Sequence, residues 1–404
     1  MNDETEQYST TNDAVTRLED ELALRRRKAR RKSRIITAVI LVILTAVAVS
    51  SAVFLVTFWD RLSPESARDY VDIRSSGNTI TKIGGAADIV TGNSSVFAAF
   101  DKGLAIATTA SVRYATVDGR SGFSQNAVFS SPAISVSEKY LLVYDRAGNS
   151  LMLFDDDGLV SSSETDGKII SASVSNNGVC AVISEADGYI SVLSVYDKSF
   201  SPVYKWYNSE YYCISAAYHD ESAVCGATVV FEQDGELFGR ILLFNVGTEG
   251  IANSIELGLS VPTELWASSE GFTAMTDRGA AFADVTGSLT AIKTFDYPVC
   301  GYSPDGSGGV FILLAPFSLT EKYSLLHVDP AGKLSSQVTI NEDVLALHAS
   351  GGYLGVLTGK SVTLYNTDLG VERIISRDSD IINIAVIRGG YAVLFSEDTL
   401  TVVQ

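Results

Sequence analysis

The chain has 404 residues and a formal net charge of −18 at pH 7, and 46% of its residues are hydrophobic, which is enough for a substantial core. Residues 1–34 carry a net charge of +2 and residues 35–59 carry none, so residues 60–404 carry −20. A body this acidic repels phosphate groups, and binding to DNA or RNA is therefore disfavoured.

Near the N-terminus, residues 35–59 form an uncharged apolar run, IITAVILVILTAVAVSSAVFLVTFW. As a helix this run would extend about 37 Å, which is long enough to cross a hydrocarbon core of about 30 Å. The run predicts one transmembrane helix. A cleaved signal peptide is the alternative, since Ala48–Ala52 contains small residues, but the run and the segment before it are longer than such peptides require.

A block of basic residues directly precedes the apolar run, and this block sets the expected orientation. By the positive-inside rule, we expect residues 1–34 to be a cytoplasmic tail, residues 60–68 a short stalk, and residues 69–404 an extracytoplasmic domain at the plasma membrane. The block is also expected to contact anionic lipid. Its eight basic residues are Arg25, Arg26, Arg27, Lys28, Arg30, Arg31, Lys32 and Arg34.

From Val96 to Gln404 a strand–turn–strand unit recurs eight times, as in FAAFDKGLAIAT, ISASVSNNGVCAVI and VCGYSPDGSGGVFILL. Repeats of about 40 residues made of short strands are typical of β-propeller blades. The second strands are expected to begin near Leu104, Leu141, Val179, Val224, Phe272, Val310, Tyr353 and Tyr391.

Three turns can be read in each repeat, many of them Asp-Gly or Asn-Gly, and three turns join four strands. The sequence therefore predicts an all-β, eight-bladed propeller, with seven blades as the fallback if one irregular repeat is absorbed. The last repeat ends at its third strand. Residues 69–76 or 78–83 are expected to supply the missing fourth strand and so to close the ring.

This repeat grammar, with turns such as SPDG and SNNG, resembles the quinoprotein-like propellers, which include the periplasmic lipoprotein of the outer-membrane assembly machine. The layout of basic tail, single span and eight repeats also resembles an uncharacterised family of membrane-anchored propellers in Gram-positive bacteria. The resemblance implies a fold and carries over no functional residue. A quinoprotein-like enzyme is one implied alternative, but the propeller region has only Trp206 and Trp266 and no tryptophan-rich docking repeat.

The segment from Tyr196 to Tyr212 is the strongest candidate for a binding site, because it holds seven aromatic residues in 17. Exposed aromatic residues anchor protein partners or stack on sugar rings. The alternative is that they fill the groove between the outer strands of neighbouring blades. The candidate binding residues are Tyr204, Trp206, Tyr207, Tyr211 and Tyr212, of which Tyr204, Trp206 and Tyr207 would form a glycan-stacking platform.

Cysteines, histidines and an acidic turn carry weaker signals. Cys213 and Cys225 are equidistant from the turn expected at His219, so a disulfide across that hairpin and simple packing both stay open. The histidines, including a solvated His219, have no metal-ligand spacing. Residues 155–158 (DDDG) lack the alternating carboxylates of a calcium loop, so a solvated turn is expected.

No catalytic motif is present, so we expect neither an enzyme nor a cofactor or metal. The sequence favours a membrane-anchored propeller that binds or scaffolds an envelope protein through loops on one face. Cell-wall glycan binding and a quinoprotein-like enzyme are the alternatives.

Overall fold

The computed structural model describes residues 72–76, 78–83, 95–117, 121–315, 317, 322–376, 381–396 and 400–403. The chain divides into two units, Met1–Ala67 and Arg68–Gln404, and the described residues belong to the second. The predicted tail, transmembrane helix and stalk (residues 1–68) lie outside them. Within the ranges given above, there is no helix with the length and apolar character needed to span a bilayer.

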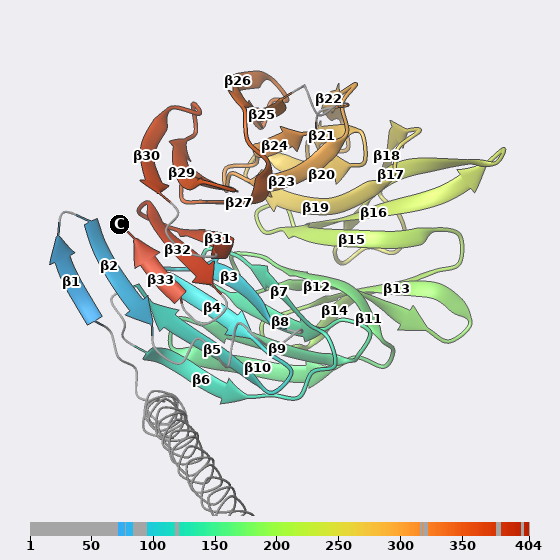
Figure 1. The fold of residues 1–404 in the computed structure, drawn as a ribbon. Coiled ribbons are helices and arrows are strands. Elements are labelled where there is room, and N and C mark those ends of the chain that lie inside the picture. Colours follow the sequence, from blue (N-terminus) through green and yellow to red (C-terminus); the bar gives the residue numbers. More distant parts are fainter. Residues whose placement is uncertain are drawn as a thin grey trace, which may run out of the picture. The chain divides into compact units, whose positions relative to one another are not determined.

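The described residues form eight antiparallel sheets, which we number as blades 1 to 8 (Figure 1). Blades 1 to 7 are each built from four consecutive strands, and blade 8 combines the last three strands with the first two. Blades 1 to 4 comprise β3 (Val96–Phe100), β4 (Gly103–Ala107), β5 (Ser111–Thr116) and β6 (Ser121–Asn126); β7 (Pro132–Val136), β8 (Leu141–Asp145), β9 (Ser150–Asp155) and β10 (Gly158–Glu164); β11 (Ile169–Val174), β12 (Cys180–Ala186), β13 (Tyr189–Tyr196) and β14 (Pro202–Asn208); and β15 (Tyr212–His219), β16 (Val224–Gln233), β17 (Glu236–Asn245) and β18 (Asn253–Gly258).

Blades 5 to 8 comprise β19 (Pro262–Ser268), β20 (Gly271–Thr276), β21 (Gly279–Ala283) and β22 (Leu289–Thr294); β23 (Val299–Pro304), β24 (Val310–Leu314), β25 (Tyr323–Val328) and β26 (Leu334–Ile340); β27 (Val344–Ser350), β28 (Tyr353–Thr358), β29 (Ser361–Asn366) and β30 (Val371–Ser376); and β31 (Ile381–Ile387), β32 (Tyr391–Ser396) and β33 (Leu400–Val403), joined by β2 (Asn78–Ile83) and β1 (Asp72–Ser76). Each second strand begins within one residue of its predicted position, and the eight-bladed propeller is confirmed.

The ring closes through the segment that precedes blade 1. Strand β2 pairs antiparallel with β33, with Ile80 opposite Val403 and Ile83 opposite Leu400. The prediction that residues 78–83 supply the missing strand is confirmed. Residues 72–76, the other segment considered, form β1, which adds a fifth strand outside β2. Blade 8, the last blade along the chain, is thus completed by β2, a strand that precedes blade 1 in the sequence.

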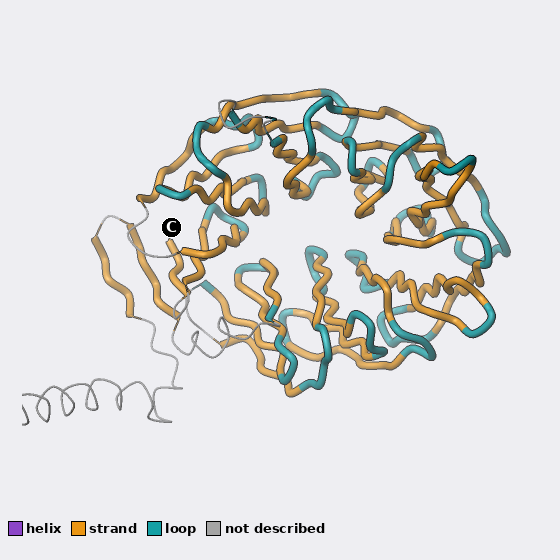
Figure 2. The backbone as a smooth tube through the Cα atoms, turned by 45° about the vertical axis from the view of Figure 1, so that its right-hand side comes forward, coloured by secondary structure: helices purple, strands orange, loops and turns teal. Residues whose placement is uncertain are grey.

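The hydrophobic core is divided among the interfaces between blades. Eight clusters of buried side chains each join two neighbouring blades, and one of them joins blade 8 to blade 1 through Phe395 and Leu104. At that junction the rings of Phe97 and Phe395 stack with their centroids 3.8 Å apart. Figure 2 shows the resulting ring of blades. The first strands of most neighbouring blades contact one another around this ring.

The first strand of each blade is a sheet edge, so some of its amide groups have no partner in their own sheet. At four blade junctions a side chain of one first strand accepts a hydrogen bond from an N–H of the next first strand. The acceptors are Ser135 (from Val174, 3.2 Å), Ser215 (from Leu265, 3.3 Å), Ser303 (from Ala349, 2.9 Å) and His348 through Nδ1 (from Val386, 3.1 Å). These contacts connect neighbouring blades close to the centre of the ring.

Candidate functional site

The alternating strand directions divide the turns between two faces of the ring. We call one the loop face: it carries the turns between second and third strands and the connections from one blade to the next. We call the opposite one the turn face: it carries the turns after the first and third strands. Every aromatic side chain that is strongly exposed among the described residues lies on the loop face: Tyr189 (48%), Tyr207 (50%), Tyr212 (66%), Tyr297 (42%) and Phe317 (66%).

The aromatic segment predicted from the sequence is split by the two-residue period of β14. Tyr204 and Trp206 turn towards blade 4, where their ring centroids lie 6.0 and 4.9 Å from that of Phe244. The Tyr204 hydroxyl donates to the carbonyl of Gly250 (3.3 Å), and burial raises the pKa of Tyr204. These two residues therefore fill the groove between blades, as the alternative interpretation predicted.

Tyr207 lies on the opposite side of β14 from Tyr204 and Trp206, because side chains alternate along a strand. Its ring meets that of Tyr189, with centroids 5.0 Å apart. The predicted platform of Tyr204, Trp206 and Tyr207 is therefore not brought together on one surface. The exposed contact pair is Tyr189–Tyr207, and Tyr189 was not among the residues predicted from the sequence.

A tight loop anchored by Asn208 holds Tyr207, Tyr211 and Tyr212 in place. The Asn208 side chain is buried, and its oxygen accepts hydrogen bonds from the backbone N–H groups of Glu210 and Tyr211, both at 3.1 Å. Its amide nitrogen donates to the Ser191 hydroxyl (3.1 Å) and to the carbonyl of Tyr211. With both ends of this amide satisfied, the loop has a fixed shape, and Tyr212 projects from it into solvent.

Tyr211 belongs to a second group that lines the long β16–β17 hairpin. Arg240 lies over the ring of Phe231, with 4.3 Å from its guanidinium carbon to the ring centroid. Arg240 also donates to the Tyr211 hydroxyl (3.3 Å) and pairs with Glu256 (2.6 Å). Burial, followed by the neighbouring Glu210 carboxylate, raises the pKa of Tyr211. The tyrosine therefore stays a neutral hydroxyl between a base and an acid.

The hairpin itself is built from strands of ten residues each and extends beyond its neighbours at the right of Figure 1. Phe231 and Phe238 face each other across it, with ring centroids 5.8 Å apart. Its tip places Leu237, which is half exposed, on the loop face. Sequence patterns do not reveal this group, because its members meet only through strand pairing across a turn.

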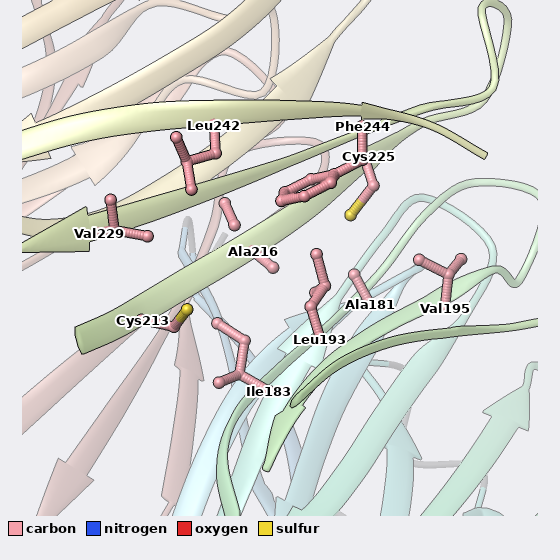
Figure 3. Close-up of a cluster of buried hydrophobic side chains, with 11 residues drawn as sticks. Ala181, Ile183, Leu193, Val195, Cys213, Ala216, Cys225, Val229, Leu242 and Phe244 are labelled. Carbon is pink, nitrogen blue, oxygen red and sulfur yellow. The ribbon is translucent and has the colours of Figure 1, made fainter. Parts of the chain in front are cut away.

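The cysteines do not pair: all four are free, including the predicted Cys213 and Cys225. The β15–β16 register is centred between Glu221 and Ser222 rather than at His219, so Cys213 lies opposite Val229, and Cys225 lies opposite Tyr218. Figure 3 shows the two sulfur atoms at separate places in the core between blades 3 and 4. Burial raises the pKa of both thiols, that of Cys225 to about 12, so they pack as neutral, unreactive groups.

The histidines also serve the packing of the ring. His219 was expected to be solvated, but it is the last residue of β15 and is buried, with Nδ1 in contact with the Ser222 hydroxyl (2.9 Å). His327 Nε2 lies 2.9 Å from a carboxylate oxygen of Asp305, and both residues are buried. Within the described ranges, no group of three or more His, Cys, Asp or Glu side chains is arranged to hold a metal ion.

The acidic turn after β9 forms through its own hydrogen bonds. The Asp155 carboxylate accepts from the N–H groups of Asp157 (3.0 Å) and Gly158 (3.1 Å), while Asp156 and Asp157 point into solvent. The basic block at residues 25–34, by contrast, lies outside the described residues. Its contact with lipid remains a prediction.

This architecture places the chain in the class of eight-bladed β-propellers. A model of a family of unknown function, DUF5711, matches residues 78–404, and the chain belongs to that family. No curated protein matches the chain.

Three solved structures show similar folds. The C-terminal WD40 domain of Sif2 is 12% identical and has a TM-score of 0.54, covering 78% of this chain and 96% of its own. Sqt1 from Saccharomyces cerevisiae is 11% identical, with a TM-score of 0.50 and coverages of 77% and 96%. BamB from Moraxella catarrhalis is 15% identical, with a TM-score of 0.47 and coverages of 78% and 99%. At these identities the likeness concerns the fold alone.

Proposed function

We propose that this protein is a membrane-anchored, extracytoplasmic propeller that binds a protein partner of the cell envelope through its loop face. The observation that carries the proposal is the gathering of all strongly exposed described aromatic side chains on that face. Rigid aromatic side chains are the residues most enriched at the energetic centres of protein interfaces. The Asn208 anchor supports this role, because a preorganised loop loses little entropy on binding.

The anchor and the location rest on the sequence. The apolar run of residues 35–59 would cross the plasma membrane, and the basic block before it would hold the N-terminus at the anionic cytoplasmic surface. An external protease should then digest the propeller in intact, wall-stripped cells. If the propeller stayed protected while a known external protein was digested, this orientation would be wrong.

The binding face is tested by crosslinking the full-length chain in cells, followed by pull-down and mass spectrometry. Tyr207→Ser/Tyr212→Ser removes two exposed rings without touching the interblade core. Ile251→Ser is the matched control, since Ile251 is 41% exposed on the turn face.

A single recurrent protein that is captured by the parent and by the Ile251→Ser control, but is lost from the double variant, would support the proposal. Capture of no enriched protein, or equal capture by the double variant, would contradict it. In that case a glycan bound at the Tyr189–Tyr207 pair becomes the next hypothesis to test.

A further inference from the structure

The loop face of blades 3 and 4 combines its exposed rings with an excess of acidic groups. Residues 169–258, which form these two blades, contain 11 acidic and three basic residues. Six of the carboxylates lie in the loop-face turns or at the loop-face strand ends of these blades, as Tyr189, Tyr207 and Tyr212 do. They are Glu185, Asp187, Glu210, Glu232, Asp234 and Glu236, and all six are exposed.

Of the three bases in these blades, two pair with carboxylates outside the six and the third lies on the opposite face. Lys205 pairs with Asp166 (3.7 Å) and Arg240 pairs with Glu256 (2.6 Å). Lys198 lies after β13, on the turn face. None of the six carboxylates forms an ion pair with any described residue of the chain. Their charge therefore acts on whatever approaches this surface.

The structure contains an internal example of how a cation is held here. The Arg240 guanidinium stacks over Phe231 while it pairs with the Glu256 carboxylate and contacts the Tyr211 hydroxyl. An aromatic ring beneath a guanidinium and a carboxylate at its edge is a favourable arrangement for arginine. The exposed loop-face surface of these blades offers the same two components, tyrosine rings and carboxylates. Its Lys205, which lies on the same side of β14 as Tyr207, pairs with Asp166.

Resting on the proposed function, we propose that the partner docks through an arginine- and lysine-rich segment on this aromatic and acidic surface of blades 3 and 4. The complementary charges would speed the encounter, and the rings of Tyr207 and Tyr212 would hold guanidinium groups. Arginine is expected to bind more tightly than lysine, because its planar group stacks on rings and pairs with carboxylates through two hydrogen bonds.

The test measures binding of fluorescein-labelled peptides to the full-length chain by anisotropy at low salt. Four peptides of equal length alternate serine with arginine, lysine, glutamate or tyrosine. The site variant is Asp187→Asn/Glu210→Gln/Asp234→Asn, and its control is Asp156→Asn/Glu221→Gln/Glu249→Gln. The control removes the same charge from exposed positions on the turn face. Asn tolerates the positive φ of Asp234 (56°), so the hairpin tip should keep its form.

We expect the arginine peptide to bind at least threefold more tightly than the lysine peptide, and the glutamate and tyrosine peptides not to bind. The site variant should weaken arginine binding at least tenfold and the control less than twofold. Tyr207→Ser/Tyr212→Ser should reduce the preference for arginine over lysine. Equal losses in the two charge variants would show a general effect of net charge and overturn the inference, as would binding of the glutamate or tyrosine peptide.

The peptide experiment and the crosslinking experiment fail separately. One outcome is that a partner is captured in cells through Tyr207 and Tyr212 while the arginine peptide does not bind. The proposed binding face would then stand, and the inference that the partner docks through a basic segment would be wrong. Absence of any captured partner would overturn the proposed function itself.

Discussion

The loop face and the turn face are made of the same repeated turns, yet they use their polar groups differently. On the turn face, the residue at the end of the third strand or directly after it repeatedly accepts two backbone N–H groups of the following turn. Asp197 does so at 2.8 and 2.9 Å, Asp284 at 2.8 and 2.9 Å, and Asn366 at 3.1 and 2.8 Å. The hydrogen-bonding groups of these side chains are therefore occupied in stabilising the fold.

On the loop face of blades 3 and 4, the anchoring role falls to the buried Asn208, and the residues around it are left exposed. Tyr207, Tyr212 and the neighbouring carboxylates make few contacts that the fold requires. Polar and aromatic content alone therefore does not mark a binding surface. What marks it is content that the fold leaves unused.

The largest expected effect concerns the buried half of the aromatic segment. Phe244 is fully buried and contacts both Tyr204 and Trp206. Phe244→Ala should lower the free energy of unfolding by about 4 kcal/mol, because it leaves a cavity between blades 3 and 4. Urea denaturation measures this. A loss below about 1 kcal/mol would mean that these rings do not form an essential core.

The next largest effect on stability is expected from the buried Asp305–His327 pair on the turn face. Burial by itself would raise the pKa of Asp305, but hydrogen bonds from His327 and Ser307 outweigh it and lower that pKa below its ordinary 3.8. Asp305→Ala should lower the free energy of unfolding by about 3 kcal/mol, because it leaves the buried His327 without its hydrogen-bond partner. It should leave partner binding unchanged. Because the folded pKa is lowered, the carboxylate's contribution is complete above pH 3.8 and is lost as the pH falls through the folded pKa.

Denaturation curves of Asp305→Ala at pH 7 and pH 3 provide the check. The difference in stability between the parent and the variant should shrink at the lower pH. If the difference in stability between the parent and the variant is the same at both pH values, the carboxylate charge does not contribute to the stability of the Asp305–His327 pair.

An effect of similar size should follow from protonation of His348 in acid. Burial lowers the pKa of His348 from 6.5 to about 4, and its Nδ1 must stay unprotonated to accept the N–H of Val386. The neutral ring therefore contributes stability that is complete above pH 6.5 and is lost as the pH falls towards 4. The loss should reach about 3 kcal/mol at pH 4.

His348→Gln keeps an acceptor oxygen but does not titrate, so its stability should fall less over this pH range. Thermal denaturation of both proteins between pH 7 and pH 4 makes the comparison. Parallel curves would show that another group controls the pH dependence.

The smallest effect on stability belongs to the loop face. Tyr207→Ser/Tyr212→Ser should change the free energy of unfolding by less than about 0.5 kcal/mol per residue, as exposed substitutions usually do. The same urea denaturation measures it. A loss of several kcal/mol would mean that these rings belong to the fold, and the contrast between the two faces would disappear.

Much of the fold could be predicted from the sequence, because tight turns with Gly, Asp and Asn fix where strands begin and end. The eight second strands were found in this way, and the closing strand 78–83 was one of the two segments expected to close the ring. The side of a strand that faces a neighbouring blade was harder to predict. Trp206 and Tyr207 are equally aromatic and adjacent, yet one is packed on Phe244 and the other is exposed.

Contacts that depend on the register between two paired strands could not be predicted from the sequence either. The Cys213–Cys225 pairing assumed a turn at His219, whereas the hairpin is centred between Glu221 and Ser222, and a bulge follows Cys213. Tyr189 and Tyr207, or Tyr211 and Arg240, come together only when two strands adopt one particular alignment. A shift of one residue would move each side chain to the other face of its sheet.

The most direct test of the central claim is to place a photo-crosslinking amino acid at single positions of the full-length chain in cells. Position 212 reports on the loop face, and position 251, which is also exposed, reports on the turn face. Our account predicts that position 212 crosslinks to one recurrent protein and that position 251 does not. Crosslinks to the same protein from position 251 alone would show that the turn face binds the partner, and the account would be wrong.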